Sequence, residues 1–365
     1  MNRIILIGNG FDLAHGLKTS YADFIDWYWG EWGKKLLHGQ SKKEEDRLCS
    51  FEIKDSIELS KWYYVWQGYY YKREKPWIPW DEHQVVELAK QDSNLCSYSI
   101  KSGFFSEVCK NVETKGWVDI ENVYYSYLSS VVIEPKVIND DLDYLSEKLV
   151  EYLSHIQKTK VMLKNEIKKK MKEPFHRPDI AVRAMAQFPD IKARFDSNNA
   201  PLSPKRYFLL NFNYTTLADL YLFDIRRTAT HIHGELSNPN SVIFGYGDEL
   251  DENYKKIMNK NDNEYLRNIK SIKYLESPNY RHLLEFIESS PYQVFIMGHS
   301  CGNSDRTLLN TLFEHKNCVS IKPFFHKWED GSDNYMELVQ NISRNFTDMK
   351  LMRDRVVNKT FCDTI

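Results

Sequence analysis

The fold of this chain is decided by residues 4–24, which read IILIGNGFDLAHGLKTSYADF. Ile4 to Ile7 is a continuous apolar run that ends at Gly8, and such runs are typical of strands buried on both faces of a parallel sheet. We expect a loop from Gly8 to Lys18. A helix should then begin with Ser20 as its N-cap, and Asp23 three residues later completes a variant of the capping box.

Alternating strand and helix patterns return after Pro204. Strands are expected over residues 207–211, 230–233, 242–244, 293–297 and 319–324, and helices over residues 216–223, 280–289, 304–314 and 335–346. This alternation predicts an α/β fold, a Rossmann-like parallel sheet flanked by helices. Right-handed crossovers place the carboxyl ends of such strands at one edge, where ligands bind in open α/β sheets.

The chain between these two parts has a different character. Its segments are aromatic and charged, with helical periodicity over residues 120–132, 142–172 and 180–188, few convincing strands, and proline-containing loops near residues 72–80 and 173–178. We therefore predict a nucleotide-binding domain of residues 1–30 and 201–365, and a large, mostly helical insertion of residues 31–200. The lysines from Lys158 to Lys172 indicate the solvent-facing side of one long helix rather than a binding stripe. The aromatic-rich insertion could also form the interface of a homo-oligomer.

The bulk properties of the chain exclude several classes of function. The 365 residues carry a formal net charge of −2, so general nucleic-acid binding is not expected. The six cysteines are scattered without a CxxC motif, which indicates neither a zinc site nor a disulfide framework, and no bound metal is expected. No stretch approaches the roughly 20 apolar residues of a membrane span, and the N-terminal apolar run is too short for a signal peptide. We expect a cytoplasmic protein with no membrane partner.

Four polar motifs fall at or just after the ends of predicted strands. They are Gly8-Asn9-Gly10, Asn211-Phe212-Asn213, His233-Gly234 and Gly298-His299-Ser300. Because the carboxyl ends of parallel strands share one edge of a sheet, all four motifs could meet at one site.

The first motif has the features of a phosphate-binding loop. Glycines permit positive φ and a close approach of the backbone to a phosphate, which the following amides can bind, although a purely structural turn is the alternative. The dinucleotide fingerprint GxGxxG is not matched, because Leu13 stands where its third glycine belongs. Phosphate would repel Asp12, which is therefore expected to cap a turn or to bind a ribose hydroxyl. The candidate ligand-binding residues of this loop are Gly8, Asn9, Gly10, Phe11 and Asp12, and Gly298 and Ser300 are candidates for a second phosphate or ribose contact.

Two side chains are candidates for catalysis. A histidine at a strand end, such as His233, can act as a general base near neutral pH, and a structural hydrogen bond is the alternative. The amide of Asn213 could hold a ribose or order a water, and capping of the next helix is the alternative. His231 would share a strand face with His233, but no third metal ligand lies nearby, so we expect a structural role for it.

Several segments together resemble the bacteriophage abortive-infection AbiH family. They are the opening IILIGNGFDLAHGLKTSYADF and the stretches WVDIE, NFNYT, HIHG and FIMGHSCGNSD. The resemblance implies a role in phage defence, with a phage trigger that the sequence does not identify.

The order of the motifs also resembles, more distantly, that of sirtuin-like NAD-binding proteins, some of which cleave NAD. By this resemblance Gly8 and Gly10 would approach the NAD pyrophosphate, while Gly298 and Ser300 would hold the adenosine side. Asn213 would lie by the nicotinamide ribose and a water, and His233 would act on the ribose hydroxyls. The pattern departs at Thr215, where sirtuin-like proteins usually carry an acid, and in the first loop, which is Gly-Ala-Gly in those proteins. The zinc-binding cysteines of deacetylating sirtuins are absent, so deacetylation is not expected.

The leading hypothesis is a phage-defence protein that binds NAD or a related nucleotide and hydrolyses the bond between nicotinamide and ribose. A non-catalytic sensor of a nucleotide or ADP-ribose is the first alternative, and Thr215 in place of an acid favours it. A nuclease effector is the second alternative, against which the near-neutral charge and the lack of a carboxylate cluster for metal count.

Overall fold

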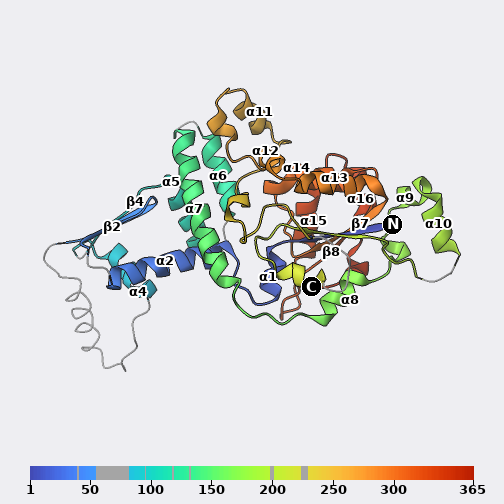
Figure 1. Cartoon of the computed structure of the whole chain (residues 1–365), viewed down its shortest axis with the longest axis horizontal. Helices are drawn as coiled ribbons and strands as arrows, with labels where there is room; N and C mark the ends of the chain where they lie inside the picture. The colour runs from blue at the N-terminus through green and yellow to red at the C-terminus, as the bar shows by residue number, and fades with distance from the viewer. Residues whose placement is uncertain are drawn as a thin grey trace. The chain divides into compact units, whose positions relative to one another are not determined.

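The computed structural model describes residues 1–38, 41–54, 82–94, 96–116, 119–130, 133–197, 201–222 and 229–365. Two compact units make up the chain: Met1–Thr19 with Leu153–Ile365 form the first, and Ser20–Tyr152 form the second (Figure 1). The two units are defined by the contacts between their residues. The domain boundaries that we expected after residues 30 and 200 rest on composition and stay a prediction.

The first unit is built on a five-stranded parallel sheet in the order β6-β5-β1-β7-β8. The strands are β1 (Asn2–Ile7), β5 (Tyr207–Asn211), β6 (Ala229–His231), β7 (Tyr292–Met297) and β8 (Cys318–Phe324). The parallel sheet predicted from the sequence is thus confirmed. Because the chain moves from β1 to β5 on one side and to β7 on the other, the carboxyl end of β1 is a topological switch point, where open α/β sheets bind ligands.

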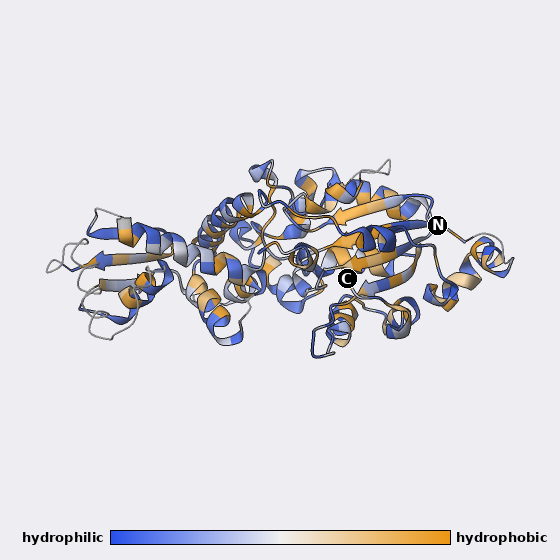
Figure 2. Ribbon diagram, turned by 90° about the horizontal axis from the view of Figure 1, so that it is seen from below, coloured by the Kyte–Doolittle hydropathy of each residue, from blue (hydrophilic) through white to orange (hydrophobic). Residues whose placement is uncertain are grey.

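Alternate residues of the strands enter two separate cores. Ile4 and Leu6 face α13 (Asn279–Ser289), α14 (Arg306–Glu314), α15 (Tyr335–Arg344) and α16 (Met349–Arg355). Ile5 and Ile7 face α1 (Asn9–Ala14), α8 (Asn165–Lys172) and the 3₁₀ helix η2 (Leu217–Leu222). Burial on both faces explains the continuous apolar runs of residues 4–7 and 294–297, and Figure 2 shows the strands of this sheet as largely hydrophobic arrows.

Smaller elements complete this unit. They are η1 (Arg177–Asp179), α9 (Val182–Gln187), α10 (Pro189–Asp196), η3 (Pro239–Ser241), α11 (Glu252–Met258), η4 (Asn263–Leu266), α12 (Lys270–Lys273), η5 (Tyr274–Glu276), η6 (Asn303–Asp305) and η7 (Lys359–Phe361).

Two expectations for this unit were wrong. The loop expected from Gly8 contains the short helix α1, because Phe11 is buried against His15 and Tyr221 and holds the turn helical. Residues 242–244 form no strand; the amide of Ile243 donates instead to the carbonyl of His233 at 2.8 Å.

The long helix expected over residues 142–172 is two helices, α7 (Pro135–Ile156) and α8. The connection between them is held away from a helix, since the amide of Lys164 donates to the Tyr221 hydroxyl at 2.8 Å and the Gln157 side chain accepts from the amide of Thr216 at 3.0 Å. Lys158 and Lys160 therefore lie in this connection, and the lysines do not form one helical stripe.

The second unit contains helices and a small sheet. Its helices are α2 (Tyr21–His38), α4 (Glu82–Gln91), α5 (Gly103–Lys115), α6 (Ile120–Ser129) and most of α7, and its antiparallel sheet has the strands β2 (Lys43–Glu45), β3 (Cys49–Ile53) and β4 (Cys96–Ile100). The sequence did not predict this sheet. The expected capping box is confirmed, because the amide of Asp23 donates to Ser20 Oγ at 3.1 Å and the amide of Ser20 donates to Asp23 Oδ2 at 3.2 Å. The loop predicted near residues 72–80 lies outside the described residues.

Candidate functional site

The loops that follow β1 and β7 pack directly on one another. The amide of Gly10 donates to the carbonyl of Gly298 at 2.7 Å. A Cβ on Gly8 would lie 2.5 Å from Cα of His299, and a Cβ on Gly298, whose φ is +77°, would overlap the backbone nitrogen of Phe11. Close packing of the two loops therefore accounts for these glycines, and the Gly10 amide already has an acceptor. Phosphate binding by this loop stays a prediction.

The turn after β5 brings Asn213 to the same place. Its side-chain amide donates to the carbonyl of Gly8 at 3.1 Å, and its backbone amide donates to Oδ1 of Asn211 at 3.0 Å. The Asn211 side chain also donates to the carbonyl of Thr215 at 3.1 Å. Asn211 thus closes the turn and fixes the direction in which Asn213 points.

Asp12 lies beneath these loops rather than at the surface. Its side chain is 1 % exposed, and Oδ2 accepts a hydrogen bond of 2.5 Å from the hydroxyl of Thr215. Oδ1 has no hydrogen-bond partner among the described residues. Burial raises the pKa of Asp12 to about 6, against the opposing hydrogen bonds.

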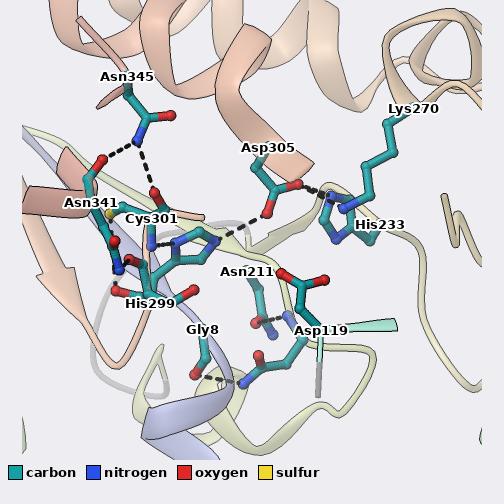
Figure 3. Close-up of polar contacts among 12 residues, drawn as sticks. Gly8, Asp119, Asn211, His233, Lys270, His299, Cys301, Asp305, Asn341 and Asn345 are labelled. Carbon is teal, nitrogen blue, oxygen red and sulfur yellow. Dashed lines mark hydrogen bonds and ion pairs between the residues drawn. The ribbon is translucent and has the colours of Figure 1, made fainter. Parts of the chain in front are cut away.

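The most highly charged part of the edge is a buried contact among His233, Asp305 and Lys270 (Figure 3). Oδ1 of Asp305 lies 2.9 Å from Nζ of Lys270 and 3.1 Å from Nε2 of His233. Burial alone would raise the pKa of Asp305, but the charge of Lys270 and the hydrogen bonds from His233 and His299 hold it well below its ordinary value. Burial, reinforced by the charge of Lys270, lowers the pKa of His233 to about 4, so its ring is neutral at pH 7.

His299 borders Asp305 on the other side. Its Nε2 lies 3.5 Å from Oδ2 of Asp305, and its Nδ1 accepts a 2.9 Å hydrogen bond from the amide of Cys301. Because Nδ1 is an acceptor, we assign the ring proton to Nε2, which faces the carboxylate. The ring of Phe212 packs against both histidines, with centroids 4.2 Å from His299 and 5.2 Å from His233.

The structure therefore brings together residues from all four motifs, and it adds two that the sequence did not predict. Asp305 directly precedes a helix, where the ordinary role of an aspartate is to cap it. It does occupy the N-cap position of α14, but its side chain makes no capping hydrogen bond and turns to Lys270 and His233. Lys270 comes from α12, in a region without a periodic pattern, so no sequence signal pointed to it.

Other candidate residues lie elsewhere. The ring of Phe11 is fully buried, so a ligand could reach only its backbone. Asn9 and Ser300 are exposed: Oδ1 of Asn9 accepts from the Thr19 hydroxyl at 2.5 Å, and the carbonyl of Ser300 accepts from the Asn341 side chain at 3.0 Å. A pocket of about 80 Å³ is lined in part by Thr215 but by none of the predicted site residues.

The two histidines of the HIHG segment have separate partners. Nε2 of His231 lies 2.9 Å from Oδ2 of Asp219, and Nδ1 lies 3.3 Å from the carbonyl of Asn213. Burial would lower the pKa of His231, but the hydrogen bond and charge of Asp219 raise it. Within the described ranges no three His, Cys, Asp or Glu side chains are placed to hold a metal ion, and no helix there is long and apolar enough to cross a bilayer.

Comparison with known proteins gives one match. The model of the family described as bacteriophage abortive infection AbiH matches residues 4–327, a range that contains all of β5 to β8, most of β1 and every residue of the site above. No curated protein and no solved structure matches the chain.

Proposed function

We propose a function from the premise that this chain belongs to the bacteriophage abortive infection AbiH family, which indicates a role in abortive infection by phage. In the proposal, the chain binds NAD or a related nucleotide at the carboxyl edge of its parallel sheet. It then hydrolyses the bond between nicotinamide and ribose, and it does so in the cytoplasm.

The observation that carries this proposal is the pairing of His233 with the buried Asp305 at the carboxyl edge of the sheet, with Nε2 of His233 3.1 Å from Oδ1 of Asp305. A general base must hold an unprotonated nitrogen at neutral pH, and burial, which lowers the pKa of His233, keeps its ring unprotonated. Nε2 lies 3.1 Å from the anionic Asp305 and 3.2 Å from the hydroxyl of Tyr274, and because the carboxylate can only accept, we assign the ring proton to Nε2. Nδ1 then keeps the lone pair that can accept a proton, and Asp305 stabilises the imidazolium that forms.

The chemistry needs no group beyond NAD and water. The bond from ribose C1 to nicotinamide breaks, the bonding pair leaves with neutral nicotinamide, and an oxocarbenium-like centre forms. His233 takes a proton from a ribose hydroxyl, and the resulting negative oxygen stabilises that centre. Asn213, held at the Gly8 carbonyl, orders the water that adds to C1. The proton lost by the water leaves to solvent, and the hydroxyl regains its proton from His233.

A second observation supports the same site. Thr215 stands where the sirtuin-like pattern has an acid, and its hydroxyl donates to the buried Asp12. A carboxyl group is therefore present at this position, although it comes from α1 rather than from the turn after β5.

The second candidate function is a sensor, because the candidate site at the carboxyl edge of the sheet is buried and its amide groups bond inside the protein. His233 is 4 % exposed, and the amides of Asn213 and Gly10 are already bonded inside the protein. A nucleotide that reaches these groups must displace internal contacts, and a sensor would use that rearrangement as its signal.

The test is release of nicotinamide from NAD by the purified chain, with and without phage lysate. His233→Ala should reduce the rate by about 100- to 10,000-fold, the usual contribution of a general base, and Asn213→Ala should also reduce it strongly. His315→Ala is the matched control, since it removes a histidine bonded to Glu288 and to the amide of Asn317 rather than to residues of the site. Release of nicotinamide by His233→Ala at the rate of the unaltered chain would refute the assignment of His233 as the base. Equally tight binding of NAD and a non-hydrolysable analogue, without turnover, would favour the sensor.

A further inference from the structure

We infer that Asn345 is a positioning residue of this site: it holds Cys301 in a left-handed conformation, so that the amide of Cys301 orients His299 against Asp305. The catalytic consequence of this inference rests on the proposed function, but the structural part does not.

Cys301 has an unusual backbone conformation. Its φ is +55° and its side chain is fully buried, whereas residues other than glycine, asparagine and aspartate rarely adopt positive φ. Such a conformation persists only where the surroundings impose it. The carbonyl of Cys301 accepts a 2.8 Å hydrogen bond from the side-chain amide of Asn345. The neighbouring carbonyl of Ser300 is held in the same way by Asn341 at 3.0 Å (Figure 3).

Asn345 is itself firmly held. It has no exposed surface, and its side-chain amide also donates to the carbonyl of Asn341 at 2.8 Å. Its own carbonyl accepts from the Asn310 side chain at 3.0 Å. One amide group therefore bridges the end of α15 and the loop after β7, so that the packing of α15 sets the place of that loop.

The contacts continue from Cys301 to the proposed base. The amide of Cys301 donates to Nδ1 of His299, and Nε2 of His299 faces Oδ2 of Asp305. The other oxygen of Asp305 lies against His233. Since the peptide groups on both sides of Cys301 move together, loss of the Asn345 bond would release the ring of His299 and leave Oδ2 of Asp305 free to turn.

The position of Asn345 along the chain is informative. It lies beyond residue 327, where the match to the family ends. The site thus depends on a C-terminal helix that is not part of the matched segment.

The first experiment compares Asn345→Leu with Asn317→Leu by thiol labelling and mass spectrometry. Asn317 is a matched control, because its buried side-chain amide also bridges two carbonyls, those of Ile287 and Glu288, next to the buried Cys318. Asn345→Leu should speed the labelling of Cys301 by about 10-fold and leave Cys318 unchanged, in line with the loss of one hydrogen bond that restrains the loop. Asn317→Leu should do the reverse. Unchanged protection of Cys301 in Asn345→Leu would overturn the inference.

The second experiment measures nicotinamide release. Asn345→Leu should lower kcat at least about 10-fold with little change in KM, because it disturbs orientation rather than binding, whereas Asn317→Leu should leave kcat unchanged. Adding Cys301→Gly to Asn345→Leu should restore part of kcat, since glycine adopts positive φ without being held. Equal losses of kcat in the two leucine variants would contradict a positioning role. Absence of release by the unaltered chain would refute the proposed function, while the labelling result would still decide the place of Cys301.

Discussion

Replacing Gly298 with alanine should destabilise the unit that carries the parallel sheet more than its backbone conformation alone would require. Gly298 has a φ of +77°, and a left-handed residue other than glycine costs about 1–2 kcal/mol. The added Cβ would also overlap the backbone of Phe11, so the loops after β1 and β7 must separate.

The size of the second effect follows from what the separation breaks. The hydrogen bond of 2.7 Å from the Gly10 amide to the Gly298 carbonyl would be lost, at about 1 kcal/mol net. Forcing a methyl group into a packed contact costs a further 1–3 kcal/mol or so. The total is about 3–6 kcal/mol, of which about 2–4 kcal/mol comes from packing rather than from φ.

Gly331→Ala separates the two effects. Gly331 has a φ of +87°, but no atom lies within 4 Å of the Cβ that alanine would add, so only the conformational penalty applies. Of the nine tryptophans, only Trp328 lies outside Ser20–Tyr152, so tryptophan fluorescence would report mainly on the other unit. The free energy of unfolding is therefore better measured by hydrogen exchange of β1 and β7 peptides in increasing urea. If Gly298→Ala destabilises these peptides no more than Gly331→Ala, the close packing of the loops is refuted.

Three further predictions concern the polar groups around these loops. Asp305→Asn removes the charge opposite the buried Lys270 and should lower the rate of nicotinamide release at least about 100-fold; a rate within threefold of the unaltered chain would contradict the role of this carboxylate. Burial raises the pKa of Asp12 to about 6 in the folded chain, so its ionisation lowers the free energy of unfolding as the pH rises from about 4 to 7. The free energy of unfolding of Asp12→Asn, measured in urea titrations, should therefore gain up to about 3 kcal/mol relative to the unaltered chain over that range. A difference that does not depend on pH would refute this. Asn211→Leu should cost about 1–3 kcal/mol, and Asn211→Asp should cost at least as much at pH 7, because it buries a carboxylate against the carbonyl of Thr215; a clearly smaller loss for Asn211→Asp would contradict the description of this turn.

The strands of the parallel sheet could be predicted because burial on both faces leaves a plain signal. Residues 4–7 and 294–297 are uninterrupted apolar runs, and each ends at a glycine required by the packing of two loops. The antiparallel sheet left no such signal. Its strand β2 consists of charged residues, and β3 pairs in part with β4, which lies more than 40 residues later along the chain. Helix α1 was missed because two glycines near its start favour a loop locally, while packing of Phe11 decides the conformation.

The candidate site was predictable only as far as strand ends determine it. Parallel strands bring Gly8, Asn213 and His299 to one edge of the sheet. The contacts of Gly8 with Asn213 and with His299 follow from that topology. The partner of His233 was not predictable. Asp305 precedes a helix, where a carboxylate ordinarily caps the backbone amides. Its side chain instead pairs with Lys270, which comes from a distant and irregular segment of the chain.

Burial of charge does not by itself mark a functional site in this chain. Arg3 is fully buried, and its guanidinium donates to the carbonyl of Met171 and the side chain of Gln293, which ties β1 to its neighbours. Lys322 is also buried, and it pairs with Glu173 and Asp179, which joins β8 to the segment around η1. Each of these cations has a structural explanation, because it links a strand to another segment of the fold.

The ion pair of Lys270 and Asp305 differs in where it lies and in what shares it. It stands beyond the carboxyl ends of the strands, and the same carboxylate also faces two histidine rings, one of which is held neutral. A buried ion pair adds little net stability compared with apolar packing, so stability does not explain why four polar side chains converge here. Perturbed ionisation at the ligand-binding edge of an open sheet is the pattern of an acid–base site. The buried ion pair and the neutral histidine at the edge of the sheet, rather than the glycines alone, indicate His233 as the candidate base.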